Sequence, residues 1–333
     1  MPDVTIIKLA NERKFEAPSG TLLLDAALAS GVILPHSCRT GRCGTCRTKV
    51  HSGRTLPLLK ESALSTTELA EGWILTCTRV AETDVVLETE DISGFELTPS
   101  RTVPCRILSL ERLAPKVLRV MLRLPPTTKF KFIAGQYIDV IGPEGVRRSY
   151  SIAGASVDGS MLELHIATVE GGVMSQFWFA EAKVNDLLRL NGPLGTFFMR
   201  SASGLDLIFL ATGTGIAPIK SMLESLGNLA KDQLPKSVTV LWGGRGLVDH
   251  YLDITNIYAD SVYIPVHSQP TASWKGAKGY VQDTLLSLVP NFTNCAVYAC
   301  GSEAMIKSAK KQVLASGLPP QRFYSDAFVS SEN

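Results

Sequence analysis

The sequence predicts a multidomain protein of mixed α+β and α/β class, with a small α+β domain, then a β-barrel, then a doubly wound α/β domain. Four cysteines near the start mark the first domain, short strands with frequent turn residues mark the second, and strands that alternate with helices mark the third. A chain of 333 residues is long for one hydrophobic core. We expect the domains to span 1–93, 101–201 and 204–333.

Four cysteines predict an iron–sulfur cluster in the first domain. Cys38, Cys43 and Cys46 lie in one short loop with the spacing C-x4-C-x2-C, and Cys77 follows in a later segment. This spacing is typical of the ligands of a plant-type [2Fe–2S] cluster. The alternatives are weaker, because disulfide frameworks belong to small secreted domains and zinc usually takes paired C-x2-C knuckles.

The elements around these cysteines fit a β-grasp ferredoxin domain. Residues 4–7 predict a strand, 21–29 an apolar helix and 85–87 a closing strand, so the cysteine loop lies between helix and sheet. Residues 91–103 include glycine, proline and serine and predict a linker.

Residues 105–200 predict the β-barrel. Strand candidates at 117–122, 137–141 and 162–167 are short and separated by turn residues, as is typical of a small barrel. In the same stretch, R-S-Y-S at 148–151 offers an arginine, an aromatic ring and a hydroxyl on one strand. Together they could hold a phosphate, stack on a flat ring and hydrogen-bond a ring atom. An exposed strand with ordinary polar side chains is the alternative.

From residue 205 the pattern becomes that of a doubly wound domain with parallel strands. The predicted strand at 206–211 runs into T-G-T-G-I-A-P at 212–218, where glycines let the backbone approach a pyrophosphate. Glycine-bearing loops at 242–245 and 299–302 also follow strands, and ligands bind at this edge of such sheets. The first loop lacks the full G-x-G-x-x-G, so a plain tight turn is its alternative. Further strands are predicted at 238–242, 262–266 and 296–299, and helices at 218–226 and 304–315.

Four motifs, in order along the chain, resemble those of the ferredoxin–NADP⁺ reductase superfamily. They are R-S-Y-S at 148–151, G-x-x-S at 172–175, G-T-G-I-A-P at 213–218 and Y-A-C-G at 298–301. In that superfamily the first two motifs bind FAD and the last two bind the nicotinamide nucleotide. Other segments, such as F-Y-S-D-A-F at 323–328, resemble the branch that contains the CDP-6-deoxy-Δ3,4-glucoseen reductases of dideoxysugar biosynthesis. Close relatives of that branch serve as reductases of multicomponent oxygenases.

The resemblance implies roles for individual residues. Ser151 would lie near flavin N5, Cys300 would border the nicotinamide, and Asp326 stands where many relatives carry glutamate near the hydride path. For Cys300, His165 and Phe328 the alternatives are a buried small residue, a core histidine and simple docking of the C-terminus. The implied FAD residues are Arg148, Ser149, Tyr150, Ser151, His165, Gly172, Val173, Met174, Ser175 and Phe328; those for NAD(P)H are Gly213, Thr214, Gly215, Ile216, Pro218, Gly243, Arg245, Cys300 and Gly301.

The same resemblance implies an NAD(P)H-dependent oxidoreductase. NAD(P)H would give a hydride to FAD, and FAD would pass single electrons to the cluster and on to a partner enzyme. The implied partner is a PLP/PMP-type CDP-sugar dehydrase. One alternative is the reductase component of an aromatic-ring or alkane oxygenase, and another is a non-enzymatic ferredoxin-type electron carrier. Asp249, close to Arg245, favours NADH because it would repel a 2′-phosphate.

Composition excludes several classes of function. The chain is 45% hydrophobic and 19% charged with a net charge of +2, which argues against nucleic acid or a membrane surface as the main partner. The N-terminus shows no signal peptide pattern, and no apolar run approaches the length of a membrane span. Cys105, Cys295 and Cys300 are left over as thiols, which fits a reducing compartment, so we expect a cytoplasmic protein.

Basic residues crowd the cysteine loop, and no acidic residue falls between 38 and 60. A solvated face is one interpretation. The other is that the electron-accepting partner presents an acidic patch to this loop. The basic residues are Arg39, Arg42, Arg47, Lys49 and Arg54.

Overall fold

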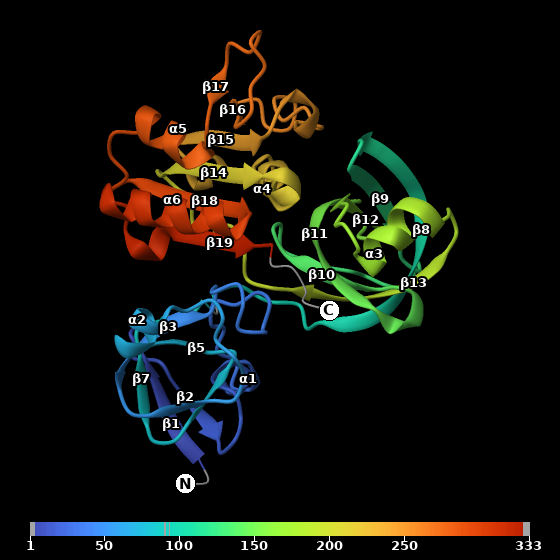
Figure 1. Ribbon diagram of the computed structural model, residues 1–333. Helices are drawn as coiled ribbons and strands as arrows, with labels where there is room; N and C mark the ends of the chain where they lie inside the picture. The colour runs from blue at the N-terminus through green and yellow to red at the C-terminus, as the bar shows by residue number, and fades with distance from the viewer. Residues whose placement is uncertain (1–3, 90, 93, 329–333) are drawn as a thin grey trace. The chain divides into compact units, whose positions relative to one another are not determined.

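The computed structural model describes residues 4–89, 91–92 and 94–328 (Figure 1). It divides into two compact units. The first runs to Leu97 and includes Gly195–Phe197, and the second comprises Thr98–Leu194 and Phe198–Phe328.

The first unit is a β-grasp domain built on a five-stranded sheet in the order β2-β1-β7-β3-β5. Side chains of β1 and β2 alternate between core and solvent, as expected of strands with one buried face. Helix α1 (Leu23–Ala29) buries four residues in the core, and α2 (Thr66–Ala70) begins with a capping box between Ser65 and Glu68. The strands are β1 (Val4–Leu9), β2 (Lys14–Pro18), β3 (Arg47–Ser52), β5 (Trp73–Leu75) and β7 (Val85–Leu87), with β4 (Thr55–Pro57) and β6 (Arg79–Ala81) in a separate two-stranded sheet.

The second unit begins with a closed six-stranded barrel in the order β10-β11-β12-β9-β8-β13. All its neighbouring strands are antiparallel. Its interior is filled by branched apolar side chains such as Ile107, Val120, Ile138 and Leu164. The strands are β8 (Arg101–Ala114), β9 (Val117–Arg123), β10 (Tyr137–Ile141), β11 (Arg147–Ala155), β12 (Met161–Ala167) and β13 (Leu187–Leu194), and the short helix α3 (Val173–Gln176) continues into a π-helical turn, Phe177–Glu181.

The rest of this unit is a six-stranded parallel sheet in the order β17-β16-β15-β14-β18-β19. The chain starts at β14, proceeds outward to β17, then returns to β18 on the other side, so β14 and β18 flank a topological switch point. Helices α5 and α6 pack together, whereas α4 lies against barrel strand β11 (Figure 1). The elements are β14 (Asp206–Thr212), α4 (Ile216–Leu226), β15 (Ser237–Gly244), β16 (Ser261–His267), β17 (Ala277–Lys278), α5 (Val281–Leu288), β18 (Cys295–Gly301), α6 (Glu303–Ala315) and β19 (Phe323–Ala327).

The predicted fold class is confirmed, with differences at element ends. The linker predicted at 91–103 is wrong for its last residues, because β8 already begins at Arg101 and pairs with β13. The helix predicted from residue 21 begins at Leu23. None of the helices in the described part of the chain is long and apolar enough to cross a membrane.

Candidate functional site

Backbone pairing brings Cys46 and Cys77 of the first unit together. The Thr76 N–H donates to the Cys46 carbonyl oxygen at 3.1 Å, and the Sγ atoms of Cys46 and Cys77 lie 3.2 Å apart. Gly41, at φ +75°, keeps the loop tight, since a Cβ there would overlap the Lys60 carbonyl oxygen. Cys46 and Cys77 are buried, whereas Cys38 and Cys43 are partly exposed.

The thiols interact in two pairs. Hydrogen bonding from Cys43 lowers the pKa of Cys38 to about 4, and a bond from Cys46 lowers the pKa of Cys77. The charge of Cys38 also acts on Cys77, which links the pairs. Backbone N–H groups of Thr40 and Cys43 reach the Cys38 Sγ at 3.4 Å. Among the described residues, no three or more potential ligands are already grouped closely enough to hold a metal ion. The chemistry of two thiol pairs, with backbone N–H groups directed at one sulfur, is that of the ligands of a [2Fe–2S] cluster.

The basic residues of the cysteine loop are largely paired. Arg39 forms an ion pair with Asp25. Arg47 reaches Glu68 at 2.6 Å, and its guanidinium lies 4.0 Å from the centre of the Trp73 ring. The loop is therefore less positive than its own sequence indicates. This pairing favours the interpretation that the basic residues form a solvated face.

Strand β11 carries the R-S-Y-S motif along the barrel. The Ser149 hydroxyl donates to Asp139 at 2.6 Å, and the Tyr150 hydroxyl accepts from the Trp178 ring N–H at 3.0 Å. Arg148 donates to the neighbouring Arg147 carbonyl oxygen. The Ser151 hydroxyl is buried and has no hydrogen-bond partner within residues 4–89, 91–92 and 94–328. An unsatisfied buried hydroxyl is unusual, and a polar atom of a bound FAD ring would satisfy it.

The second FAD motif, at the start of α3, is arranged differently from the prediction. The Ser175 hydroxyl already accepts from the Val169 N–H at 2.8 Å. Met174 is buried in the barrel core, and a Cβ added to Gly142 would overlap its sulfur. Val173 is exposed. The Gly172 N–H also has a partner, since it donates to the Val169 carbonyl oxygen at 3.1 Å.

His165 on β12 is fully enclosed. Its Nε2 lies 2.9 Å from a Glu163 carboxylate oxygen, and its Nδ1 lies 3.1 Å from the Tyr251 hydroxyl. Both ring nitrogens are thus engaged by protein groups. This geometry favours the core-histidine interpretation over direct contact with a pyrophosphate.

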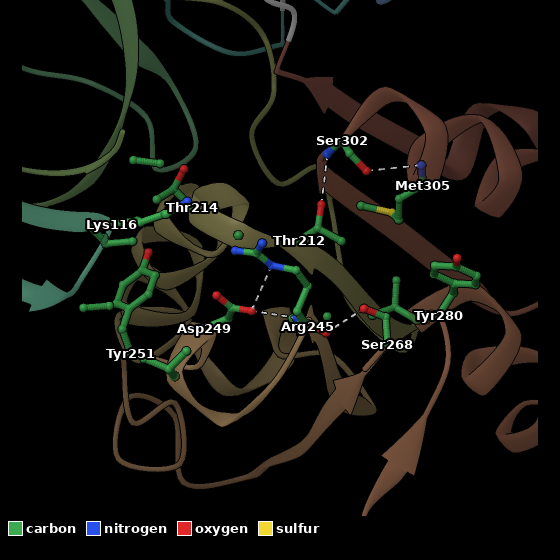
Figure 2. Close-up of a pocket in the computed structure, with 18 of the residues that line it drawn as sticks. Lys116, Thr212, Thr214, Arg245, Asp249, Tyr251, Ser268, Tyr280, Ser302 and Met305 are labelled. Atoms are coloured by element: carbon green, nitrogen blue, oxygen red, sulfur yellow. Dashed lines mark hydrogen bonds and ion pairs between the residues drawn. The ribbon is translucent and has the colours of Figure 1, made fainter. Parts of the chain in front are cut away.

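Glycines let the ends of β14 and β18 approach closely. A Cβ on Gly215 would overlap the Cys300 carbonyl oxygen, and one on Gly301 would overlap the Thr212 hydroxyl. That hydroxyl accepts from the Ser302 N–H at 2.9 Å (Figure 2). The loop conformation that follows β14 therefore depends on the absence of side chains at two positions.

A cavity of about 750 Å³ opens at this edge of the sheet, between it and the barrel. That volume is within the usual range of small-molecule sites. Of the predicted residues, Gly213, Thr214, Gly243 and Arg245 line it, whereas Gly215, Ile216, Pro218, Cys300 and Gly301 lie outside its lining. The prediction missed several lining residues, which share no local motif. They are Thr168 and, labelled in Figure 2, Lys116, Tyr251, Ser268, Tyr280 and Met305.

Arg245 and Asp249 meet at the wall of this cavity (Figure 2). The Asp249 carboxylate accepts from the backbone N–H groups of Arg245 at 2.7 Å and Gly246 at 3.3 Å. The Arg245 Nε lies 3.8 Å from the same carboxylate. A fixed negative charge therefore accompanies the one arginine of this loop.

Three predicted residues gather where β18 and β19 end. Cys300 pairs with Asp326 in the strand register, and the Phe328 N–H donates to the Gly301 carbonyl oxygen at 2.9 Å. Burial and the Asp326 charge raise the pKa of the Cys300 thiol well above its usual value, so this thiol stays protonated. Phe328 is 42% exposed, which leaves its ring available to a ligand.

Three family models match successive parts of the chain. The 2Fe-2S iron-sulfur cluster binding domain matches residues 7–82. The oxidoreductase FAD-binding domain matches residues 104–199, and the oxidoreductase NAD-binding domain matches residues 209–311. These spans cover most of the β-grasp domain, the barrel and the parallel sheet, respectively.

Individual proteins match over nearly the whole chain. The CDP-6-deoxy-L-threo-D-glycero-4-hexulose-3-dehydrase reductase of Yersinia pestis is 40% identical over 322 residues, covering 96% of both chains. The toluate 1,2-dioxygenase electron transfer component of Pseudomonas putida is 30% identical over 325 residues, again covering 96% of both. Among solved structures, the cytochrome P450 reductase GcoB of Amycolatopsis is similar, with a TM-score of 0.73, 28% identity and coverage of 97% and 98%.

Proposed function

The chain belongs to the family of iron–sulfur flavoprotein reductases that join 2Fe-2S, FAD-binding and NAD-binding domains, and we propose that it passes electrons from NADH to a CDP-sugar dehydrase. The observation that carries the choice of partner is the 40% identity to the Yersinia dehydrase reductase over 96% of both chains. Identity to the dioxygenase component is 30% over the same share. The proposed acceptor is a PLP/PMP-type enzyme that deoxygenates C3 of a CDP-hexose.

The reductase component of an oxygenase is the second candidate. It is supported by the similarity to the toluate dioxygenase component and to GcoB. Both candidates use the same electron path and differ in the acceptor. A non-enzymatic carrier is disfavoured, because such a protein has no need of a nucleotide cavity or of the unsatisfied Ser151 hydroxyl.

Residues of all three domains would take part in electron transfer from NADH through FAD to the cluster. Bound FAD would accept a hydride from the nicotinamide and release single electrons to the cluster. Ser151 would hold the flavin ring by its free hydroxyl, and the backbone of Gly213 and Thr214 would hold the nucleotide at the cavity. Cys300 would present a neutral thiol behind the nicotinamide, and Asp326 would hold that thiol in place. Cys38, Cys43, Cys46 and Cys77 would bind the cluster. Each of the proposed domains, 1–93, 101–201 and 204–333, contains one of the matched spans.

NADH is the proposed electron donor. The Asp249 carboxylate can accept hydrogen bonds from ribose hydroxyls, but it would repel a 2′-phosphate. Arg245 lies against the same carboxylate, which offsets its attraction for a phosphate.

Reconstitution with purified partners tests the choice of acceptor. The protein is mixed with NADH and one of two acceptors. A CDP-4-keto-6-deoxyhexose 3-dehydrase is supplied with its CDP-sugar under anaerobic conditions, and a toluate-type dioxygenase is supplied with its substrate in air-saturated buffer, because it consumes O2. We expect deoxygenated CDP-sugar to form faster than the dioxygenase product. Faster turnover with the dioxygenase would favour the second candidate, and reduction of neither enzyme would contradict both.

A further inference from the structure

A buried ammonium group joins the nucleotide-binding sheet to the barrel. Lys220 lies on α4, the helix that follows the Gly213–Gly215 turn, and is 8% exposed. Its Nζ donates to the Ala153 carbonyl oxygen at 3.2 Å and to the Glu163 carboxylate at 3.0 Å. A third bond, of 2.7 Å, goes to Glu224 one turn further along α4. All three donors of the ammonium are thus used, two of them by barrel strands β11 and β12.

The barrel makes room for this contact. Gly154 on β11 follows Ala153, and the pairing of β11 with β12 shifts register between Ile152 and Gly154. A Cβ added to Gly154 would lie 3.0 Å from the Lys220 Nζ and 3.2 Å from a Glu163 oxygen. Ser151, the candidate flavin residue, lies three positions earlier on the same strand.

The chain of contacts continues from Glu163 to the nucleotide cavity. The second Glu163 oxygen lies 2.9 Å from the His165 Nε2, and the His165 Nδ1 lies 3.1 Å from the hydroxyl of Tyr251, which lines the cavity. Burial opposes ionisation of Glu163, but the His165 bond and the Lys220 charge outweigh it and lower its pKa to about 2. Burial keeps Tyr251 a neutral phenol. The consistent arrangement is that the His165 Nε2–H donates to Glu163 and the His165 Nδ1 accepts a hydrogen bond from the Tyr251 hydroxyl.

Tyr251 is connected through Trp242 to the glycine loop that precedes α4. Its ring stands edge-on to Trp242, with centroids 5.0 Å apart. The Trp242 ring N–H donates to the Gly213 carbonyl oxygen at 3.0 Å. The contacts therefore form a closed ring. They lead from the glycine loop along α4 to barrel strands β11 and β12, then to Tyr251, and through Trp242 back to the glycine loop.

We propose that Lys220, Glu163 and His165 are positioning residues that lock the glycine loop and the Tyr251 wall of the cavity in one orientation to strand β11. This rests on the proposed function and deepens it, because a hydride moves only when nicotinamide and flavin hold a fixed geometry. Stability alone does not account for the network. Buried ion pairs are commonly no more stabilising than apolar side chains of the same size, so orientation is the property they add.

Two variants separate positioning from stability. Lys220→Met leaves Glu163 without its counter-charge, so it is expected both to destabilise the unit and to slow flavin reduction. The double variant Lys220→Met with Glu163→Leu replaces the ion pair by apolar side chains and is expected to fold with FAD bound. Lys236→Met is the control, because Lys236 forms an exposed ion pair with Asp206 at 3.6 Å and touches no part of the network.

The measurement is anaerobic stopped-flow reduction of the flavin by NADH, which separates the limiting rate from the apparent Kd. We expect the double variant to lose about tenfold or more in limiting rate. Its flavin spectrum and its cluster EPR signal after dithionite reduction should match those of the wild type. A folded double variant that reduces its flavin at the wild-type rate would overturn the proposal. Failure of the wild-type protein to be reduced by NADH would instead refute the proposed function, and the two failures are therefore distinct.

Discussion

The Sγ atoms of Cys46 and Cys77 lie 3.2 Å apart although 31 residues separate them in the chain. The antiparallel pairing of β3 with β5 brings them together, since Arg47 lies opposite Leu75 and the Thr76 N–H donates to the Cys46 carbonyl oxygen. The cluster ligands are therefore completed by strand pairing as well as by the cysteine loop.

Replacement of Cys77 should separate reduction of the flavin by NADH from electron transfer to the cluster. Cys77→Ser removes one thiolate, so we expect loss of the [2Fe–2S] EPR signal while NADH still reduces the flavin in the other unit. Cys105→Ala is the matched control, because Cys105 is buried in the barrel. An unchanged EPR signal in Cys77→Ser would contradict the ligand assignment.

Gly215 lies where the backbone leaves no room for a side chain. In Gly215→Ala the new Cβ would overlap the Cys300 carbonyl oxygen, so the loop must move. We expect the KM for NADH to rise by about tenfold or more, with the flavin spectrum unchanged. Gly246→Ala is the control, since a Cβ there meets nothing within 4 Å. Equal KM values for the two variants would argue against a role of this close packing.

Because the Ser151 hydroxyl is unsatisfied, we expect its removal to change protein stability in opposite directions with and without bound FAD. Ser151→Ala removes a buried unsatisfied group, so the FAD-free protein should gain about 1 kcal/mol in free energy of unfolding. In the FAD-loaded protein the same change should lower thermal stability and slow reduction by NADH. Thermal unfolding of both forms measures this, and a change of the same sign in both would contradict the assignment.

Asp249 should set the preference between the two nicotinamide nucleotides. Asp249→Asn keeps an oxygen for the Arg245 N–H but removes the charge, so the ratio of kcat/KM for NADH to that for NADPH should fall by about tenfold. Asp260→Asn, at an exposed carboxylate, is the control. An unchanged ratio in Asp249→Asn would place the selectivity elsewhere.

His250 should make the second unit sensitive to mild acid. Burial and the neighbouring His267 lower its pKa from the ordinary 6.5 to about 4, against the pull of Asp249. The unfolded chain therefore binds a proton more readily, so this stability is complete above about pH 6.5 and is lost as the pH falls towards 4.

The midpoint of thermal flavin release, measured from pH 7.5 to 5.5, tests the effect of His250. His250→Gln should flatten its pH dependence. His51→Gln is the control, since His51 is exposed and lies in the other unit. A profile as steep in His250→Gln as in the wild type would rule out this source of acid sensitivity.

Local patterns were sufficient to predict the fold class and the centres of the main elements. The loop after β14 and the loop after β15 both carry glycines at strand ends, and both contribute to the cavity. The cysteine spacing is also a local signal, and three of those cysteines share one loop. Each of these features depends on a few residues that are close together in the sequence.

Features that depend on distant residues were not predictable. Tyr251 and Lys116 reach the cavity only because the barrel and sheet pack together, and neither belongs to a motif. The positive charge of the cysteine loop is partly neutralised by Asp25 and Glu68, which lie outside residues 38–60 and so do not appear in the local charge pattern. The start of strand β8 is predicted as linker, since Pro104 and alternating polar residues obscure a strand that is buried on one face only.

Anaerobic titration of the purified protein with NADH, followed by visible absorption and EPR, tests the electron path most directly. The account predicts bleaching of the flavin together with the appearance of a rhombic [2Fe–2S] signal. Flavin bleaching without that signal would contradict it, because the electrons of NADH would then stop at FAD.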